Sequence, residues 1–426
     1  MIKPAKPCAA SLICRPSNYN HDNSNDLHPP CPQRARTREL EKSWENRTRE
    51  SYQFVVVGAG PAGLTAVANL IDNGISRIAW IDSSFSGGRM GEKYREIPSN
   101  TKIQLFLDYV AASPTLTKLV HEAEEKPNAY TTLEELERDR GNLLSYAADL
   151  MIMLTRRLVS AHRNEVDTFQ ARVHSLDFID GVGWMVDVEM MDPVSHQATI
   201  LKTSKVILAT GSEPVQPKEK AIPPIDLEVA LAPSQLEAAT EGIDLEKETI
   251  AVVGSSHSAF LVLRNLIGLS NRVRVVHLLR NPKIRFAEQR DGWILYDNTG
   301  LKGVVADWAK DEYPNLVAEG RILKTQIEAS EGALSLHLTT LTSCARVIYA
   351  IGYQPTPTAR VTLAGLEQSL KFDHLTGHFE RLPGLFGCGI AFPQRVVDPA
   401  GNVERAVGIF KFMKFLRAVV PLWIQS

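Results

Sequence analysis

The residues of this chain best suited to chemistry are three glycines and one acid. Gly58, Gly60 and Gly63 have the spacing G-x-G-x-x-G, and Asp82 follows 19 residues after the last of them. In a strand-turn-helix unit the first glycine permits a tight turn, the second lets the backbone approach a pyrophosphate, and the third lets helix and strand pack closely. An acid at that distance can accept hydrogen bonds from a ribose. The pattern predicts a dinucleotide site, with further contacts from Pro61, Ala62 and Ser83.

The elements around these residues have the order that such a site requires. Apolar runs at 54–57 and 78–81 read as strands, and an alanine-rich helix begins near Pro61 and ends at Gly74. This is a βαβ unit in which unpaired amides and the helix dipole face the phosphates.

A second copy of this unit follows about 200 residues further along the chain. Apolar strands are expected at 249–253 and 273–279, with a helix at 260–267 between them. Serine stands in the intervening turn where the first copy has glycine. The predicted nucleotide contacts of this turn are Gly254, Ser255, Ser256, His257 and Ser258.

Arg280 ends the second strand of that copy, in the place that Asp82 takes in the first. A guanidinium can form charge-assisted bonds to a 2′-phosphate, which favours NADPH over NADH. The alternative is a surface arginine that pairs with an acid such as Asp291.

Composition narrows the class of protein. The chain has 426 residues, 44% apolar and 23% charged, with a net charge of −2, so its charge gives no reason to expect a nucleic-acid partner. Its five cysteines form no C-x-x-C pair, which suits a reducing compartment and predicts a cytoplasmic location. No apolar run reaches the roughly 18 residues of a transmembrane helix.

The rest of the chain supplies the expected boundaries. Residues 1–50 lack apolar periodicity and are expected to be a disordered leader. Helices are expected over 132–163 with a break at Gly141, followed by a hairpin around Asp180. A strand at 346–350, and a strand with a glycine turn over 384–393, are expected to return to the first sheet, before an amphipathic terminal helix. The predicted domains are 51–215 and 341–426 for one nucleotide, with 216–340 inserted for the other.

Several motifs in this order resemble the flavoproteins with two dinucleotide-binding domains, most closely the class B flavin monooxygenases and related N-hydroxylases. The resemblance implies an α/β fold of two Rossmann-like domains, with the NAD(P) domain inserted into the FAD domain. It implies FAD at the first glycine turn and NADPH at the second.

The resemblance also assigns further residues. Gly87-Gly88-Arg89-Met90 is similar to the family's G-G-x-W turn beside the flavin, and Ser99-Asn100-Thr101-Lys102 to its T-N-x-x-K stretch. The asparagine of that stretch lies near the reactive face of the flavin, so Asn100 is the expected catalytic residue. The other implied cofactor contacts are Gly88, Arg89, Met90, Val173, Thr210, Gly211, Gly389 and Ile390.

Three positions depart from the family pattern. Residues 231–234 lack the fingerprint histidine, Gly387-Cys388-Gly389 replaces a G-D pair, and Ser256 replaces a glycine. Cys388 is expected to be a small structural residue under the flavin.

Three functions follow as alternatives. The first is a monooxygenase that takes hydride from NAD(P)H, passes it through the flavin, and transfers oxygen from O2 to a small-molecule substrate. The second is a flavin-dependent reductase or dehydrogenase without oxygen transfer, and the third an inactive protein that only binds nucleotide. Neither the substrate nor the oligomeric state is predicted.

Overall fold

The computed structural model describes residues 48–191, 198–218, 222–327 and 341–426. The expected leader lies outside these residues except for 48–50, which already belong to the first strand. In the described residues no helix is long and apolar enough to cross a membrane.

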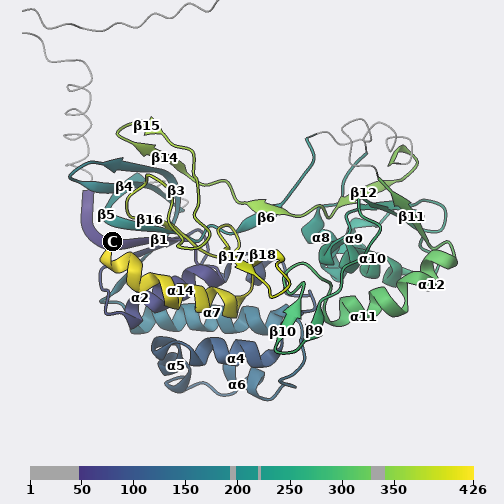
Figure 1. The fold of residues 1–426 in the computed structure, drawn as a ribbon, viewed down its shortest axis with the longest axis horizontal. Helices are drawn as coiled ribbons and strands as arrows, with labels where there is room; N and C mark the ends of the chain where they lie inside the picture. The colour runs from purple at the N-terminus through teal and green to yellow at the C-terminus, as the bar shows by residue number, and fades with distance from the viewer. Residues whose placement is uncertain (1–47, 192–197, 219–221, 328–340) are drawn as a thin grey trace, which may run out of the picture. The chain divides into compact units, whose positions relative to one another are not determined.

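The first glycine turn belongs to an eight-stranded sheet with the order β15-β14-β3-β2-β1-β5-β16, and β4 pairs with β3 and β5 (Figure 1). The strands β3, β2, β1, β5 and β16 run parallel. The predicted hairpin around Asp180 is confirmed as the antiparallel pair β3 and β4. The strands are β1 (Thr48–Val57), β2 (Ile78–Asp82), β3 (Val166–Ile179), β4 (Gly183–Met190), β5 (Ala198–Leu208), β14 (Arg360–Leu363), β15 (Leu366–Glu367) and β16 (Leu385–Gly387).

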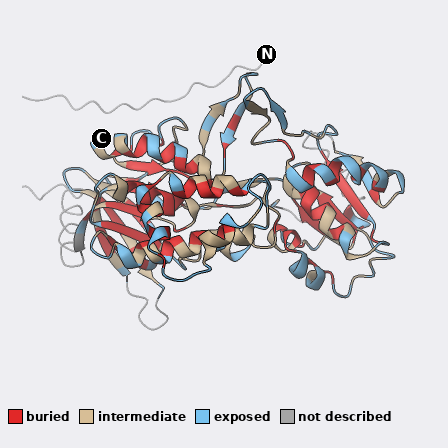
Figure 2. Ribbon diagram, turned by 90° about the horizontal axis from the view of Figure 1, so that it is seen from below, coloured by how far each residue is buried: buried red, intermediate tan, exposed pale blue. Residues whose placement is uncertain are grey.

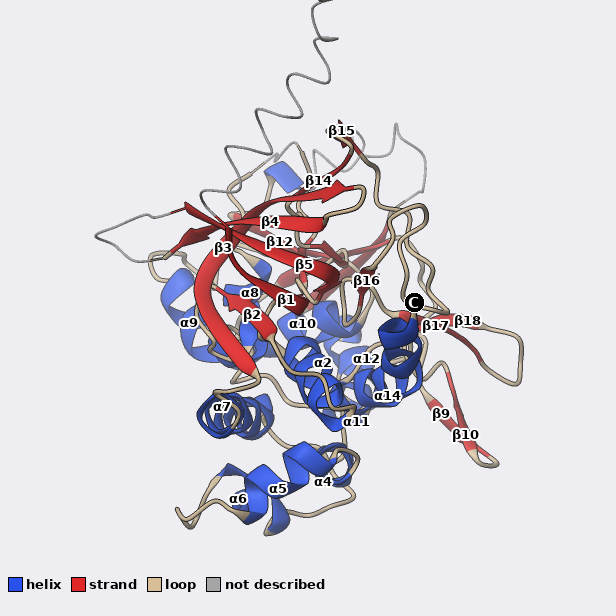
Figure 3. Cartoon of the chain, turned by 90° about the vertical axis from the view of Figure 1, so that its left-hand side faces the viewer, coloured by secondary structure: helices blue, strands red, loops and turns tan. Residues whose placement is uncertain are grey.

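Helices cover one face of this sheet (Figure 3). Phe54 and Val56 of β1 point into the core that these helices form, whereas Tyr52 and Val55 point into the core on the other face. Burial on both faces explains why the end of β1, residues 54–57, is a continuous apolar run, and the buried strands are visible in Figure 2. The helices are α2 (Pro61–Asp72), α3 (Gly88–Glu92), α4 (Ile103–Ala111), α5 (Pro114–His121), α6 (Ala129–Glu134), α7 (Leu144–Ala161) and α14 (Ile409–Gln425).

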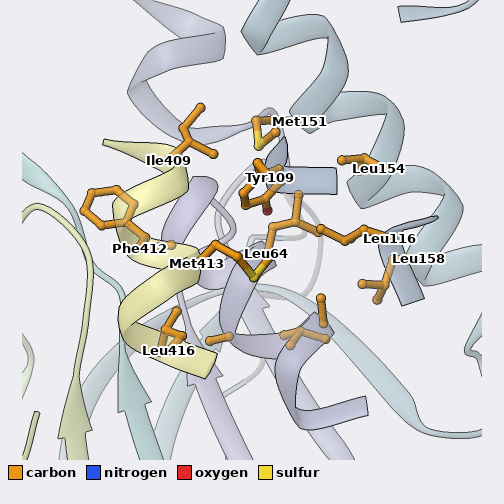
Figure 4. Close-up of a cluster of buried hydrophobic side chains, with 14 of the residues drawn as sticks. Leu64, Tyr109, Leu116, Met151, Leu154, Leu158, Ile409, Phe412, Met413 and Leu416 are labelled. Atoms are coloured by element: carbon orange, nitrogen blue, oxygen red, sulfur yellow. The ribbon is translucent and has the colours of Figure 1, made fainter. Parts of the chain in front are cut away.

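The expected amphipathic terminal helix is α14, and it docks on this core. Its Met413 and Leu416 are fully buried beside Leu64 of α2 and Tyr109 of α4 (Figure 4). The Tyr109 hydroxyl lies 3.0 Å from that of Thr65, and burial raises the pKa of Tyr109. Close packing of this kind fixes the helix against the layer that begins at the glycine turn.

The second glycine turn belongs to a separate four-stranded parallel sheet, with the order β11-β8-β7-β12. Its strands are β7 (Ile250–Val253), β8 (Val275–Leu279), β11 (Ile322–Gln326) and β12 (Arg346–Tyr349). Its helices are α8 (Leu227–Leu231), α9 (Pro233–Ala239), α10 (His257–Leu269), α11 (Gly303–Asp311) and α12 (Tyr313–Ala318).

One expected strand assignment is wrong. Residues 346–350 were expected in the first sheet, but β12 pairs with β7 in the second. A Cβ on Gly254 would lie 2.1 Å from the Ala350 carbonyl oxygen, and a Cβ on Gly58 would lie 2.4 Å from that of Ala209. Ala350 directly follows β12, and Ala209 directly follows β5. Thus β12 lies beside β7 and its glycine turn in the second sheet as β5 lies beside β1 and its glycine turn in the first. The strand at 385–387 does join the first sheet, where it pairs with β5.

Short two-stranded pairs complete the described chain. Antiparallel β6 and β13 lie where the chain leaves one sheet for the other and returns (Figure 1). The buried Glu404 carboxylate of β18 accepts hydrogen bonds from Asn298 and Thr299 of the loop before α11, the latter at 2.6 Å. The pairs are β6 (Ser212–Pro214) with β13 (Tyr353–Pro355), β9 (Glu288–Arg290) with β10 (Trp293–Leu295), and β17 (Gln394–Val397) with β18 (Val403–Ala406).

Candidate cofactor and active site

A cavity of about 590 Å³ opens beside the first glycine turn, and segments far apart in the sequence line it. The α10 residue His257, from the second unit, reaches the same cavity. The predicted residues that line it are Gly58, Gly60, Pro61, Ala62, Asp82, Ser83, Gly88, Arg89, Met90, Asn100, Thr210, Gly211, His257, Gly389 and Ile390.

The remaining predicted residues do not line this cavity. Gly63 is buried beneath the first turn, and Val173 lies in β3. Of the second turn, Gly254, Ser255, Ser256 and Ser258 lie outside the lining, with Ser256 exposed as the N-cap of α10. Their cofactor roles stay predictions.

The three glycines of the first turn differ in whether the surrounding structure would accept a side chain. Gly58 has a φ of +108°, and a Cβ on Gly63 would lie 1.8 Å from the Gly58 carbonyl oxygen, so neither position accepts a side chain. A Cβ on Gly60 would meet only the Gly88 Cα, at 3.9 Å. The second glycine is therefore not required by packing, and it leaves space on the cavity side of the turn, where a ligand backbone could approach.

The carboxylate of Asp82 braces the polypeptide around the cavity. One oxygen accepts a hydrogen bond from the Ala59 amide at 2.7 Å, and the other accepts from the amides of Ser84 and Phe85 at 2.9 and 2.8 Å. The carboxylate thus joins the glycine turn to the loop behind β2 while it borders the cavity.

A side chain from the neighbouring strand holds each glycine turn in the same way. The Trp80 indole donates a hydrogen bond to the Gly58 carbonyl at 2.9 Å. His277 Nε2 lies 2.7 Å from the Gly254 carbonyl, and its Nδ1 lies 2.8 Å from the Tyr313 hydroxyl. Sequence reasoning missed both residues, although a polar ring at the same position of two otherwise apolar strands was a readable signal.

The register corrects the comparison between Arg280 and Asp82. Gly58 donates to the carbonyl of Ile81, and Gly254 donates to that of Leu278. Ile81 and Leu278 are therefore equivalent, which makes Leu279 the counterpart of Asp82. Arg280 lies one residue further, exposed at the end of β8. The apolar runs at 78–81 and 273–279 differ in length, so the sequence alone cannot show that Arg280 is offset by one residue from the counterpart of Asp82.

Two polar atoms on the cavity wall are buried without a partner among the described residues, Thr210 Oγ1 and His257 Nδ1. Burial and the positive charge of Lys302 lower the pKa of His257 to about 4, so its imidazole is neutral at physiological pH. Unpartnered polar atoms and the open side of Gly60 fit a bound dinucleotide, which offers oxygens and hydroxyls to such a wall.

A polar group between the two units was also missed. Arg89 and Tyr94 of the cavity wall both bind the carboxylate of Glu228 in α8, at 2.5 and 2.8 Å. Tyr353 lines the cavity beside them. Arg89 belongs to a predicted motif, but Tyr94, Glu228 and Tyr353 carry none, and only the fold brings the four together.

Cys388 is fully buried, next to Gly389 of the cavity wall. Burial raises the pKa of its thiol to about 12, which keeps the thiol protonated and unreactive. A Cβ on Gly389 would lie 2.5 Å from that of Ala62, so this turn packs closely against the start of α2.

Comparisons with known proteins agree with this geometry. The family model of the pyridine nucleotide-disulphide oxidoreductases matches residues 52–386. The chain is 39% identical over 393 residues to Monooxygenase AgnR1 of Paecilomyces divaricatus, covering 87% of this chain and 98% of the relative.

Two solved structures illustrate the fold. An ornithine N-hydroxylase of Kutzneria sp. 744, solved with reduced FAD, NADP+ and L-ornithine, matches with a TM-score of 0.58 and 13% identity, over 88% of this chain and 99% of that one. A bacillithiol disulfide reductase of Bacillus cereus matches with a TM-score of 0.51 and 14% identity, over the same shares of both chains. The two glycine turns, the cavity beside the first and these matches agree: the chain belongs to the pyridine nucleotide-disulphide oxidoreductase family.

Proposed function

We propose that this protein is an FAD-dependent monooxygenase that uses NADPH and O2 to insert one oxygen atom into a small molecule. The second oxygen atom leaves as water, with two electrons from NADPH and protons from solvent balancing the reaction. The observation that carries the proposal is the cavity to which both nucleotide-binding units contribute, in a chain 39% identical to a monooxygenase.

The roles of the residues follow from their positions. Gly58, Gly60 and Asp82 would hold the FAD pyrophosphate and ribose, and Thr210 Oγ1 would satisfy its hydrogen bond on the ligand. Bound FAD would supply the redox chemistry that carries two electrons from NADPH to O2. Because that chemistry belongs to the cofactor, the protein must orient the reactants and exclude water.

Asn100 is the residue that we assign to the reactive face of the flavin. It borders the cavity, and a Cβ on Gly303, at the start of α11, would lie 3.8 Å from the Asn100 Cα. Its amide can donate or accept a hydrogen bond without a change of charge. His257, neutral at the same wall, would contact NADPH from the second unit, together with residues 254–258 and Arg280.

The predicted division of the chain is 51–215, 216–340 and 341–426. We further propose that this division holds, except that the inserted domain ends after Tyr349 instead of at residue 340. The pairing of β12 with β7 supports that shift. A cytoplasmic location is proposed on the cysteine pattern of the sequence, to which the buried thiol of Cys388 adds support.

A flavin-dependent reductase is the second candidate, because residues 231–234 lack the fingerprint histidine of the monooxygenases. A dithiol mechanism finds no support, since the described cavity lining contains no cysteine.

Spectroscopy on the purified chain tests the proposal. An FAD spectrum that NADPH bleaches without air supports both enzymes. Re-oxidation in air through a spectroscopically distinct species then indicates a monooxygenase, whereas a single phase with stoichiometric hydrogen peroxide indicates a reductase. Failure of the folded chain to bind FAD would refute both.

A further inference from the structure

A charged hub connects the two glycine turns across the cavity. The Glu228 side chain is only 18% exposed, and its Oε1 accepts hydrogen bonds from Arg89 at 2.5 Å and from Tyr94 at 2.8 Å. Arg89 follows Gly88 directly in α3, so the hub holds the turn beside the proposed flavin site. Glu213 lies 3.9 Å from the same guanidinium.

Helix α8, which carries Glu228, connects this hub to the second turn. The Asn265 side-chain amide of α10 donates hydrogen bonds to the carbonyls of Ala230 and Leu231 in α8, at 3.1 and 3.2 Å. α10 is the helix that starts at the second turn. Burial raises the pKa of Tyr94, so its phenol keeps its proton.

Tyr94 gives the one proton of its hydroxyl to Glu228. The carboxylate aligns both of its donors, Arg89 and Tyr94, because hydrogen bonds to a charged acceptor are the stronger ones.

We propose that Glu228 is a positioning residue that fixes the two cofactor-binding turns relative to each other and thereby sets the approach of the nicotinamide to the flavin. The names of the cofactors rest on the proposed function; the connection between the turn at Gly88 and α10 does not. Without Glu228, Arg89 retains among the described acids only the more distant Glu213, and the Tyr94 hydroxyl loses the acceptor that Glu228 provides.

Hydrogen exchange on the full chain tests the connection without any activity. Two amides report on the two ends: Lys93, which donates to Arg89 in α3, and Phe260, which donates to Ser256 in α10. In Glu228→Ala, both should exchange about tenfold faster, since a hydrogen bond to a charged group is worth at least that factor. Glu228→Gln, which keeps the shape and the Tyr94 contact, should show a smaller increase at both.

Glu96→Ala is the matched control. Glu96 accepts from the Ser234 amide at 3.0 Å and also from its hydroxyl, so it too joins the two units, but it does not line the cavity. This control should leave exchange at Lys93 and Phe260 unchanged. Unchanged exchange at either amide in both Glu228 variants would overturn the proposal. If Glu228→Ala does not fold, Glu228→Gln alone decides.

Flavin reduction measured by stopped flow adds a functional readout. At saturating NADPH, Glu228→Ala should reduce its flavin at least about tenfold more slowly, because misalignment by about an ångström costs that much or more. The dissociation constant for NADPH should change less than the rate. An unchanged reduction rate would overturn the positioning role. A chain that binds no FAD would instead refute the proposed function, and hydrogen exchange would still decide the role of Glu228.

Discussion

Single residues of this site both stabilise the backbone and face the space for ligands. Asp82 accepts three amide hydrogen bonds and also borders the cavity, so its position is fixed before any ribose binds. His257 shows the opposite arrangement, a buried nitrogen without a partner among the described residues. A bound group that supplies the missing hydrogen bond would offset the free-energy cost of removing this nitrogen from water.

Replacing Asn100 by alanine tests the reacting face. We expect FAD to remain bound and coupled turnover to fall at least about tenfold, because one oriented hydrogen-bonding group is removed. NADPH consumption and hydrogen peroxide release measure coupling. Lys102→Ala is the control, since Lys102 pairs with Asp139 at 3.3 Å outside the cavity. Normal coupling in Asn100→Ala would exclude Asn100 from the site.

Replacing Arg280 by alanine tests the 2′-phosphate assignment. The Michaelis constant for NADPH should rise about tenfold while that for NADH stays nearly constant, because only NADPH carries the phosphate that a guanidinium binds. Arg272→Ala, which removes an exposed arginine paired with Glu246 at 2.7 Å, should affect neither. Equal effects on the two nucleotides would refute the assignment.

At the scale of elements, the two βαβ units repeat one construction. In each, the amide of the first glycine binds the neighbouring strand, and a ring on that strand binds the glycine carbonyl. Hydrogen bonds thus hold both backbone polar groups of this glycine, its N–H and its carbonyl. Such fixation keeps the unpaired amides of the following helix aimed at the ligand.

This repetition predicts a reciprocal pair of variants. Trp80→Phe removes the bond to Gly58 and should weaken FAD binding about tenfold without changing NADP+ binding; His277→Phe should do the reverse at Gly254. Titration calorimetry with each nucleotide measures the effects. Two variants with the same profile would show that the turns are not held independently.

The terminal helix makes a second prediction at this scale. Trp423 is fully buried, stacks on Phe386 with 4.7 Å between ring centroids, and donates a hydrogen bond to the Thr376 carbonyl at 2.8 Å. Trp423→Ala should lower the free energy of unfolding by about 3–5 kcal/mol, as measured with urea. FAD should also be lost more readily, because Ile409 and Phe412 of the same helix line the cavity. The control is Leu422→Ala, which changes a side chain that is 58% exposed and should have little effect.

At the scale of the molecule, buried neutral histidines make stability depend on pH. Burial lowers the pKa of both His257 and His277 to about 4, against 6.5 when unfolded. Between these values the unfolded chain binds protons that the folded chain does not, so stability falls as pH decreases through this window. From pH 7.5 to 5 each histidine should cost about 2 kcal/mol of the free energy of unfolding.

Urea unfolding at the two pH values measures this loss. His277→Phe should lose only about half as much stability over the same interval, whatever its stability at pH 7.5. Carboxylates with a lowered pKa, such as Asp297, change the stability mainly at pH values below this window. They therefore do not mask the loss of stability that the histidines cause between pH 7.5 and 5. A pH response equal to that of the parent chain would refute the contribution of His277.

The sequence by itself determined the features that depend on neighbouring residues. The spacing of Gly58, Gly60 and Gly63, the break before α7 and the hairpin of β3 and β4 follow from turn chemistry and periodicity, which act over a few residues. Motif order added the family, because several weak patterns in one sequence are together specific.

Only the tertiary structure decided which sheet β12 joins, which residue is equivalent to Asp82, and that Glu228 meets Arg89, 139 residues away in the chain. The first is a choice between two sheets that a four-residue apolar strand suits equally well. The second is a one-residue register, and the third a contact between an acid and a base that no local pattern connects. Such choices are fixed by burial and pairing summed over the whole chain, and so they have no signature within any single segment.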